Sequence, residues 1–306
     1  MNAVAPPRMD MAERDATYEP NGERRRVMVL GNCVAERLCR MLVEYPGFAD
    51  AFTMLPTPMI HTVTDPARLQ TLAEAAHTCD IVLTQPLFSF GPCNTEELRK
   101  TLRPGAQRLI LFSSPDFEAY FPDVLRLEGK ENLRFEPILD WDSAIIFSCF
   151  LAGVSIFEVE AIYRNHPLFH SEAVEKSITS ALETYVRREQ GLDLPTKAFV
   201  LRNYAGTRLF HSPKHPVDSF LLLMLRDMAA ALGLDRNAPA SAVDGFGFNS
   251  WPVITRHHGR FTFPEQDYFL LAGKRYGLED VAMAYYNFYE FHPHVVEANK
   301  DKAIAV

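Results

Sequence analysis

Cysteine is scarce in this sequence and follows no pattern. The 306-residue chain has five cysteines, an odd number, and no two of them form a C-x-x-C pair. Disulfide frameworks and structural zinc sites both need paired or regularly spaced cysteines, so neither fits this chain. Cysteines of this kind are typical of a reducing compartment, and we therefore expect the protein to be cytoplasmic.

The features of membrane and secreted proteins are missing as well. No window reaches the roughly 18 consecutive apolar residues that a spanning helix needs, so we expect no membrane span. Residues 1–23 are polar, contain proline, and lack the apolar core of a secretory signal. We interpret residues 1–23 as a flexible N-terminal arm.

An excess of positive charge is also missing. The chain has 31 Lys and Arg residues against 39 Asp and Glu residues, which gives a net charge of −8. Non-specific binding to nucleic acid needs a basic surface that displaces counterions from phosphates, so we expect no nucleic-acid partner. An anionic ligand would need a local basic pocket.

Nucleotide fingerprints and metal-binding patterns are absent too. The segment Gly245-Phe246-Gly247 lacks the third glycine and the flanking strand and helix of a dinucleotide site. His257 and His258 are adjacent, so their side chains point in different directions, and no acidic or cysteine partner has ligand spacing. We expect no metal.

What the sequence does contain is an alternation of short apolar runs with amphipathic segments. The apolar runs, each typical of a buried strand, are 27–30, 81–83 and 109–112. The segments with helical spacing that follow or precede them are 34–42, 66–77 and 95–102. This alternation predicts an α/β fold, with a parallel sheet covered by helices on both faces. Ligands of such sheets bind beyond the carboxyl ends of the strands.

The second half of the chain has a different organisation. Residues 172–190 and 217–234 have helical spacing, whereas 197–201 and 207–210 are typical of short strands. The last 70 residues are rich in aromatic residues and weak in periodicity. We divide the chain into an arm (1–23), the first part of the α/β core (24–140), a helical insertion or cap (141–195), a return to the core (196–235), and a C-terminal region of unclear role (236–306).

The first strand ends in Gly31-Asn32-Cys33, directly before a helical pattern. This turn would hold the sulfur of Cys33 at a helix N-terminus, where the helix dipole and exposed N–H groups favour a thiolate. Cys33 is therefore a candidate nucleophile. The alternative is that Cys33 is a small buried core residue, as single cysteines often are.

A second segment, Ser212-Pro213-Lys214-His215-Pro216, precedes the helical pattern at 217–234. It is similar to the Asp-x-x-His-Pro block of SGNH-type esterases and acetyltransferases, in which the histidine is the general base. Ser212 stands where that block has its Asp. The alternative is that His215 caps the helix and Pro216 starts it. Together with Cys33, the segment predicts a nucleophile and base at one sheet edge.

These segments belong to a larger set that resembles the WcbI-like family of bacterial capsule polysaccharide biosynthesis proteins. The blocks that carry the resemblance are Val27–Leu38, Gln85-Pro86, Ser113–Asp123, Gly153–Glu158 and the stretch from His215-Pro216 to Leu232-Gly233-Leu234. The resemblance implies an SGNH/flavodoxin-like parallel sheet with an additional helical region. It also implies binding of coenzyme A and transfer of acetyl from acetyl-CoA, as co-substrate, to a sugar such as a deoxyheptose.

Acyl transfer needs a base, donors for the oxyanion and cations for the phosphates. His215 would activate either the sugar hydroxyl or Cys33, and the sequence leaves both routes open. Asn32 and Gln85 are candidate oxyanion donors, with hydrogen bonding of a turn as their alternative role. The residues that we expect to contribute to the coenzyme A site are Gly31, Arg202, Arg208 and Lys214.

Two other functions remain open at this point. One is an SGNH-like thiol esterase, although the cysteine and the missing Asp at position 212 count against efficient hydrolysis. The other is a non-catalytic scaffold of capsule assembly that binds coenzyme A or a nucleotide. The oligomeric state and the acceptor sugar do not follow from the sequence.

Overall fold

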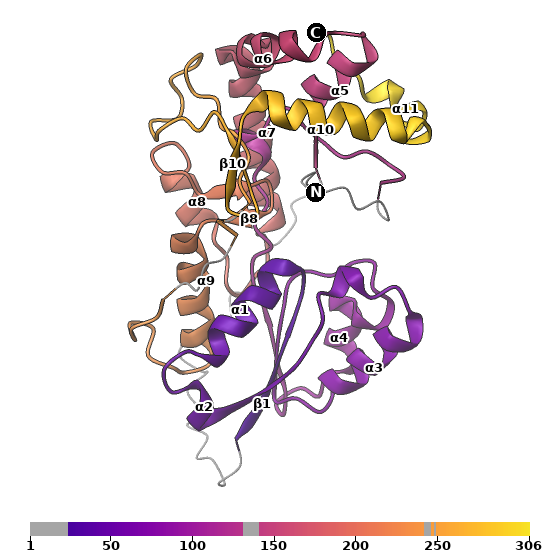
Figure 1. Cartoon of the computed structure of the whole chain (residues 1–306). Coiled ribbons are helices and arrows are strands. Elements are labelled where there is room, and N and C mark those ends of the chain that lie inside the picture. Colours follow the sequence, from indigo (N-terminus) through magenta and orange to yellow (C-terminus); the bar gives the residue numbers. More distant parts are fainter. Residues whose placement is uncertain (1–23, 131–140, 242–245, 248) are drawn as a thin grey trace, which may run out of the picture.

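The structure is a computed structural model that describes residues 24–130, 141–241, 246–247 and 249–306. The expected N-terminal arm, residues 1–23, lies outside the described residues. Figure 1 shows two parts, with a sheet and its covering helices below and a largely helical part above. Within the described residues, no helix combines the length and the apolar character needed to cross a membrane.

The lower part confirms the predicted α/β fold. Its sheet has four parallel strands in the order β2-β1-β3-β4, and their bounds are β1 Arg25–Leu30, β2 Phe52–Leu55, β3 Ile81–Thr84 and β4 Arg108–Leu111. All three predicted apolar runs lie in or directly beside these strands. β2 was not predicted, because this four-residue edge strand is only partly buried and so has no continuous apolar run.

Helices cover both faces of the sheet, as the alternation predicts (Figure 1). Along β1, Val27 and Val29 belong to one hydrophobic core, whereas Met28 and Leu30 belong to a second. This division follows from the two-residue period of a strand. The first core includes α1 (Cys33–Val43) and α9 (Asp218–Ala231), and the second includes α3 (Pro66–Ala76) and α4 (Thr95–Thr101).

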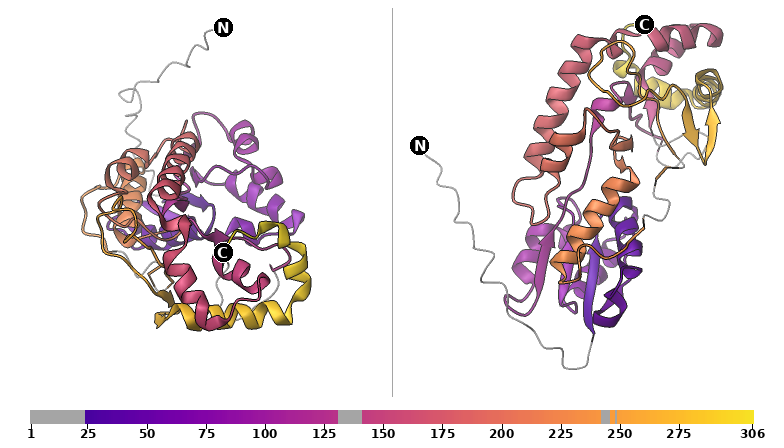
Figure 2. Two further views of the ribbon diagram at one scale, coloured as in Figure 1. Left: turned by 90° about the horizontal axis from the view of Figure 1, so that it is seen from above. Right: turned by 90° about the vertical axis from the view of Figure 1, so that its left-hand side faces the viewer.

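The upper part is mostly helical and continues upward from the carboxyl ends of the strands (Figures 1 and 2). Its helices are α5 Ala144–Leu151, α6 Ile156–Asn165, α7 Ser171–Arg188, α10 Leu278–Phe291 and α11 Pro293–Ala298. The remaining helices and strands are α2 Phe48–Ala51, β5 Val124–Leu125, β6 Asp142–Ser143, α8 Lys197–Asn203, β7 Phe210–Ser212, β8 His215–Pro216, β9 Phe269–Leu271 and β10 Lys274–Tyr276. The segment after α7 returns to the sheet, where the Leu194 N–H donates to the carbonyl of Leu111.

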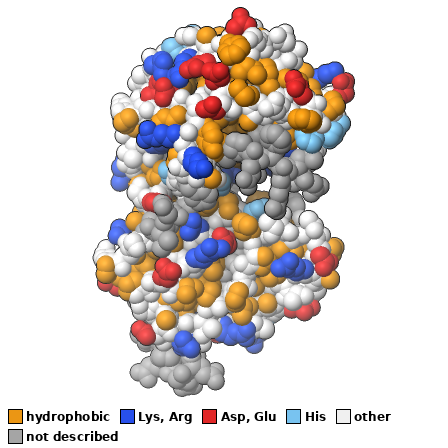
Figure 3. Space-filling view, viewed as in Figure 1, with side chains coloured by type: hydrophobic (Ala, Val, Ile, Leu, Met, Phe, Trp, Pro, Cys, Tyr) orange, Lys and Arg blue, Asp and Glu red, His pale blue; other side chains and the backbone are white. Residues whose placement is uncertain are grey.

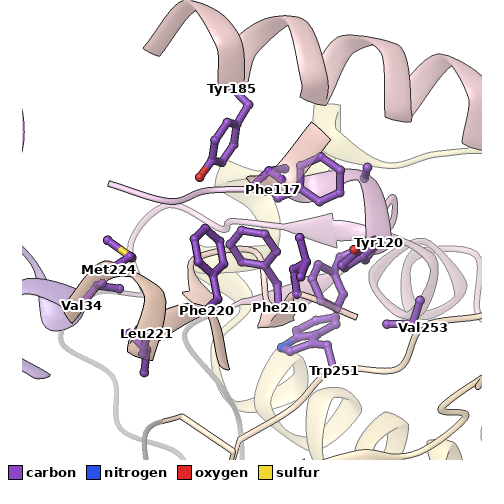
Figure 4. Close-up of a cluster of buried hydrophobic side chains, with 14 of the residues drawn as sticks. Val34, Phe117, Tyr120, Tyr185, Phe210, Phe220, Leu221, Met224, Trp251 and Val253 are labelled. Carbon is purple, nitrogen blue, oxygen red and sulfur yellow. The ribbon is translucent and has the colours of Figure 1, made fainter. Parts of the chain in front are cut away.

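A cluster of buried aromatic side chains joins the two parts (Figure 4). Phe210 of β7 stacks on Phe117 at 5.7 Å between ring centroids and meets the edge of Phe220 on α9 at 5.6 Å. Phe117 in turn contacts Tyr120 in an edge-to-face arrangement. These contacts hold the strand before His215 firmly against α9 and the segment that follows β4.

Residues 197–201, predicted as a strand, form a helix instead, so this prediction is wrong. They belong to α8, which begins close to the buried side chain of Glu189. The carboxylate of Glu189 accepts hydrogen bonds from the N–H groups of Thr196 and Lys197, which satisfies the start of the helix. The four apolar residues 198–201 fit a strand or a buried helix equally well, and here the acceptor on Glu189, at the end of the preceding helix, decides.

The second predicted strand, 207–210, is displaced. The observed strand β7 begins only at Phe210 and pairs in antiparallel fashion with β8, so that Ser212 faces His215 across a hairpin. The predicted helices at 172–190 and 217–234 are confirmed as α7 and α9, each shortened by a few residues at the C-terminal end.

Candidate functional site

The turn between β1 and α1 has no room for a side chain at its first position. A Cβ atom on Gly31 would lie 2.4 Å from Oε1 of Gln85 and 2.6 Å from the Cβ of Ala35. Asn32 is the N-cap of α1, and its Oδ1 accepts a hydrogen bond from the N–H of Val34 at 2.9 Å. Cys33 is therefore the first residue of the helix, at the position where the helix dipole stabilises negative charge.

The side chain of Gln85 is hydrogen-bonded to the backbone of this turn. Its side chain is 2% exposed, and its Oε1 accepts from the backbone N–H of Asn32 at 2.9 Å. Its Nε2 donates to the carbonyl oxygen of Ser113 at 3.3 Å, so Gln85 ties together the ends of β1, β3 and β4. Of the two roles that the sequence left open for Gln85, this geometry favours hydrogen bonding of the turn over oxyanion binding.

His215 approaches Cys33 from the β7–β8 hairpin, in which it is the first residue of β8. Its Nε2 lies 3.5 Å from Sγ of Cys33, so the predicted approach of the two side chains is confirmed. Its Nδ1 lies 2.9 Å from Oγ of the buried Ser212. Pro216 is part of β8, and the N-cap of α9 is Val217, which makes no side-chain capping bond. The alternative that His215 caps a helix is therefore wrong.

The three side chains form a chain of contacts from Ser212 through His215 to Cys33. When the hydroxyl of Ser212 accepts from Nδ1–H, Nε2 presents its lone pair to the thiol of Cys33 and can take up a proton. This is the arrangement of an activated nucleophile whose base is oriented by a third group. Ser212 directs Nδ1 of the imidazole but, unlike an Asp, contributes no full negative charge.

Asn32 can present its side-chain amide beside this pair. While Oδ1 caps the helix, Nδ2 points toward Oγ of Ser114 at 3.4 Å, so the amide orientation is fixed from both ends. An amide held in this way at a helix N-terminus is suited to stabilising an oxyanion. Ser114 belongs to the segment after β4 that the sequence places at the ligand-binding edge of the sheet, but the sequence analysis gave it no role of its own. Its position after a buried strand was the signal that could have identified it.

Phe246 is a second residue that the sequence analysis did not assign to the site. Its ring stacks on the imidazole of His215, with 4.4 Å between centroids and 9° between the ring planes. The segment around it was considered only as a dinucleotide fingerprint, and Gly245 lies outside the described residues. Only the folded chain shows this contact, because Phe246 and His215 are 31 positions apart in the sequence.

Arg208, expected near the coenzyme A phosphates, has internal partners instead. Its guanidinium donates to the side chains of Gln266 and Ser250 and to the backbone carbonyls of three further residues, which are Phe210, His211 and Trp251. Burial lowers the pKa of Arg208 to about 10. These contacts favour a structural role, in which Arg208 fastens the strand before His215 to the C-terminal region.

The other basic residues differ in their access to the site. Lys214, next to His215, places Nζ 5.4 Å from the centre of the Trp141 ring and 4.0 Å from Oδ2 of Asp116. Arg202 lies exposed in the last turn of α8. The cluster Arg24–Arg26 lies at the amino end of β1, at the edge of the sheet away from Cys33. Of these basic residues, Lys214 is the one that directly adjoins His215 in the chain.

Figure 3 shows that the surface is hollowed between the upper and the lower part of the molecule. Among the residues that the structure describes, no group of three or more His, Cys, Asp or Glu side chains is placed to hold a metal ion. The adjacent His257 and His258 donate from Nε2 to two separate backbone carbonyls, those of Arg164 and Ile254.

Comparison with known proteins agrees with this architecture. A solved structure described as WcbI, a novel polysaccharide biosynthesis enzyme, has the same fold, with a TM-score of 0.69, 20% sequence identity, and coverage of 90% of this chain and 93% of that chain. It is described as the native protein without a disulfide bond between coenzyme A and one of its cysteines. No curated protein matches the sequence. The sequence model of the family "Polysaccharide biosynthesis enzyme WcbI" matches residues 26–237, which is most of the chain. The chain therefore belongs to the WcbI family of polysaccharide biosynthesis enzymes.

Proposed function

We propose that this protein transfers an acetyl group from acetyl-CoA to a hydroxyl of a capsular sugar, for example a deoxyheptose. The observation that carries the proposal is the Ser212–His215–Cys33 chain at the carboxyl edge of the sheet, with contacts of 2.9 and 3.5 Å. An imidazole oriented in this way beside a thiol and an amide donor supplies the base and the oxyanion stabilisation of acyl transfer.

In the direct route, His215 acts on the sugar. Nε2 takes the proton of the sugar hydroxyl as the oxygen attacks the carbonyl carbon of acetyl-CoA. The new C–O bond forms, the C–S bond to coenzyme A breaks, and the departing thiolate receives the proton from His215. Asn32 donates from Nδ2 to the carbonyl oxygen while it carries negative charge.

In the covalent route, His215 first takes the proton of the Cys33 thiol. Sγ attacks the acetyl carbon, the bond to coenzyme A breaks, and the coenzyme A thiolate leaves with the proton from His215. The sugar hydroxyl then gives its proton to Nε2 and attacks acetyl-Cys33, which releases the cysteine. Both routes need His215 as the base, and only the second needs the sulfur of Cys33.

Coenzyme A is an anionic ligand. Its phosphates need cations in a protein of net charge −8, and Lys214 lies directly beside His215. We place the pantetheine thiol near Cys33 and His215. The coenzyme A named in the description of the structural neighbour supports this choice of ligand.

Binding and transfer can be tested separately. Calorimetric titration with coenzyme A is expected to show binding, and no heat or thermal shift at millimolar coenzyme A would contradict this choice of ligand. For transfer, the protein is incubated with acetyl-CoA with and without a panel of heptose acceptors, and both free coenzyme A and acetylated sugar are measured. We expect release of coenzyme A that depends on the sugar and equals the amount of acetyl-sugar. Release without a sugar would instead indicate a thiol esterase, and no release would indicate a scaffold.

A further inference from the structure

Phe246 lies flat against the face of the His215 imidazole. The two rings are nearly parallel, with 9° between their planes and 4.4 Å between their centroids. Phe246 is itself partly buried and packed against the main hydrophobic core. The stacked pair therefore joins the C-terminal region to the base of the proposed reaction.

Two hydrogen-bonding contacts of His215 act on its ring nitrogens. Ser212 contacts Nδ1 at 2.9 Å, and Cys33 contacts Nε2 at 3.5 Å. These contacts direct the two nitrogens, but they restrain only weakly a tilt of the ring about the line that joins them. A flat aromatic surface at van der Waals distance restrains that tilt, because tilting would drive one edge of the imidazole into it.

The stack also suits the charge that His215 acquires. The face of a phenyl ring carries the negative part of its quadrupole and attracts a cation placed over it. When Nε2 takes up a proton, the imidazole becomes a cation that lies over this face. The contact between the two rings therefore becomes more favourable as Nε2 takes up the proton, and it stabilises the protonated His215 that the proposed reaction forms.

We propose that Phe246 is a positioning residue that holds the imidazole of His215 in the plane from which Nε2 reaches Cys33 and the acceptor hydroxyl. The proposal rests on the proposed function only for its effect on turnover. The orientation and protonation of the ring do not depend on which acyl group is transferred, and so can be measured separately.

The kinetic test compares Phe246→Leu with Phe246→Tyr. Leucine keeps apolar contact but removes the aromatic face, so we expect kcat to fall roughly 10- to 100-fold, as for other misplaced catalytic groups, with little change in KM for acetyl-CoA. Tyrosine keeps the face and is expected to retain kcat within about threefold. The matched control is Phe157→Leu, since Phe157 is 83% exposed on α6 and its replacement should change neither constant.

The second readout is nitrogen NMR of the His215 ring in the unliganded protein. We expect a proton fixed on Nδ1 in the wild type and in Phe246→Tyr, and a mixture of tautomers in Phe246→Leu. The proposal would be overturned if Phe246→Leu had the kcat and the ring spectrum of the wild type. It would also be overturned if Phe246→Tyr, with an unchanged thermal midpoint, were as impaired in kcat as Phe246→Leu. If the wild type transfers no acetyl group, the proposed function fails, whereas the NMR result still decides the role of Phe246.

Discussion

The Sγ atom of Cys33 lies 3.5 Å from Nε2 of His215, although 182 positions separate the two residues in the sequence. The parallel sheet brings them together, because β1 ends at the turn that carries Cys33 and the β7–β8 hairpin is fastened over the same edge. A thiol beside an imidazole at a helix N-terminus is expected to react faster than an ordinary cysteine.

We therefore expect Cys33 to be alkylated first when the protein is treated with iodoacetamide near neutral pH. Burial raises the pKa of Cys39, Cys93 and Cys149 to about 11, so their thiolate fractions at neutral pH are very small. Peptide mass spectrometry over time should show a single fast site. The reaction at Cys33 should slow markedly in His215→Gln. Equal rates at Cys33 and Cys39 would show that the imidazole does not activate the thiol.

The tight turn at Gly31 gives a prediction about stability. In Gly31→Ala, the new methyl group would meet Oε1 of Gln85 and Cβ of Ala35, both closer than 3 Å. We expect a loss of about 1–3 kcal/mol in the free energy of unfolding, as for other overpacked sites, with a large loss of turnover because Cys33 shifts. Chemical denaturation measures the first effect and the transfer assay the second.

The matched control for this change is Gly206→Ala. There the added Cβ would approach only Oγ1 of Thr262, at an ordinary 3.9 Å. If both variants lose equal stability, the close approach of Gln85 to the turn is not what requires glycine at position 31.

The buried carboxyl of Asp123 predicts how stability depends on pH. Burial raises its pKa to about 6, although Ser143 and Tyr163 donate hydrogen bonds to it. The folded protein therefore holds a proton that the unfolded chain has already released, so stability falls as the pH rises from about 4 to about 6. At about 1.4 kcal/mol per pH unit, this contribution amounts to about 3 kcal/mol.

Comparison with Asp123→Asn isolates this contribution, because the amide does not titrate. The free energy of unfolding of the wild type minus that of the variant should decrease across this pH window and be constant above it. A difference that is constant from pH 4 to pH 7 would show that Asp123 is already ionised in the folded protein at pH 4.

The parts of the fold that could be predicted from the sequence are those encoded locally. Val27–Leu30 and Ile81–Leu83 are apolar without interruption because both faces of the sheet are covered, and such runs are readable. The helix at 197–201 could not be predicted from its own residues, since the N–H groups at the start of this helix bond to the carboxylate of Glu189. That acceptor comes from the end of another helix.

The same distinction applies to the site. Cys33 and His215 could be predicted because each directly precedes a helical pattern, at a position where a parallel sheet places ligand-binding residues. The internal partners of Arg208 and the stacking of Phe246 on His215 depend on residues 250–266 and on the C-terminal region, whose periodicity is weak. Tertiary contacts of this kind leave no local pattern in a single sequence.

The role of His215 is the central claim, and the turnover of His215→Ala tests it most directly. Both proposed routes use His215 as the base, so kcat for acetyl transfer should fall by roughly 100- to 10,000-fold, the usual effect of removing a general base. Cys33→Ser is assayed in parallel. If the sugar attacks acetyl-CoA directly, this variant should keep appreciable activity. If the route is covalent, it should be as inactive as His215→Ala, and acetyl-Cys33 should be trapped in the wild type. Near-normal turnover in a folded His215→Ala protein would contradict the account, because the base would then be another residue.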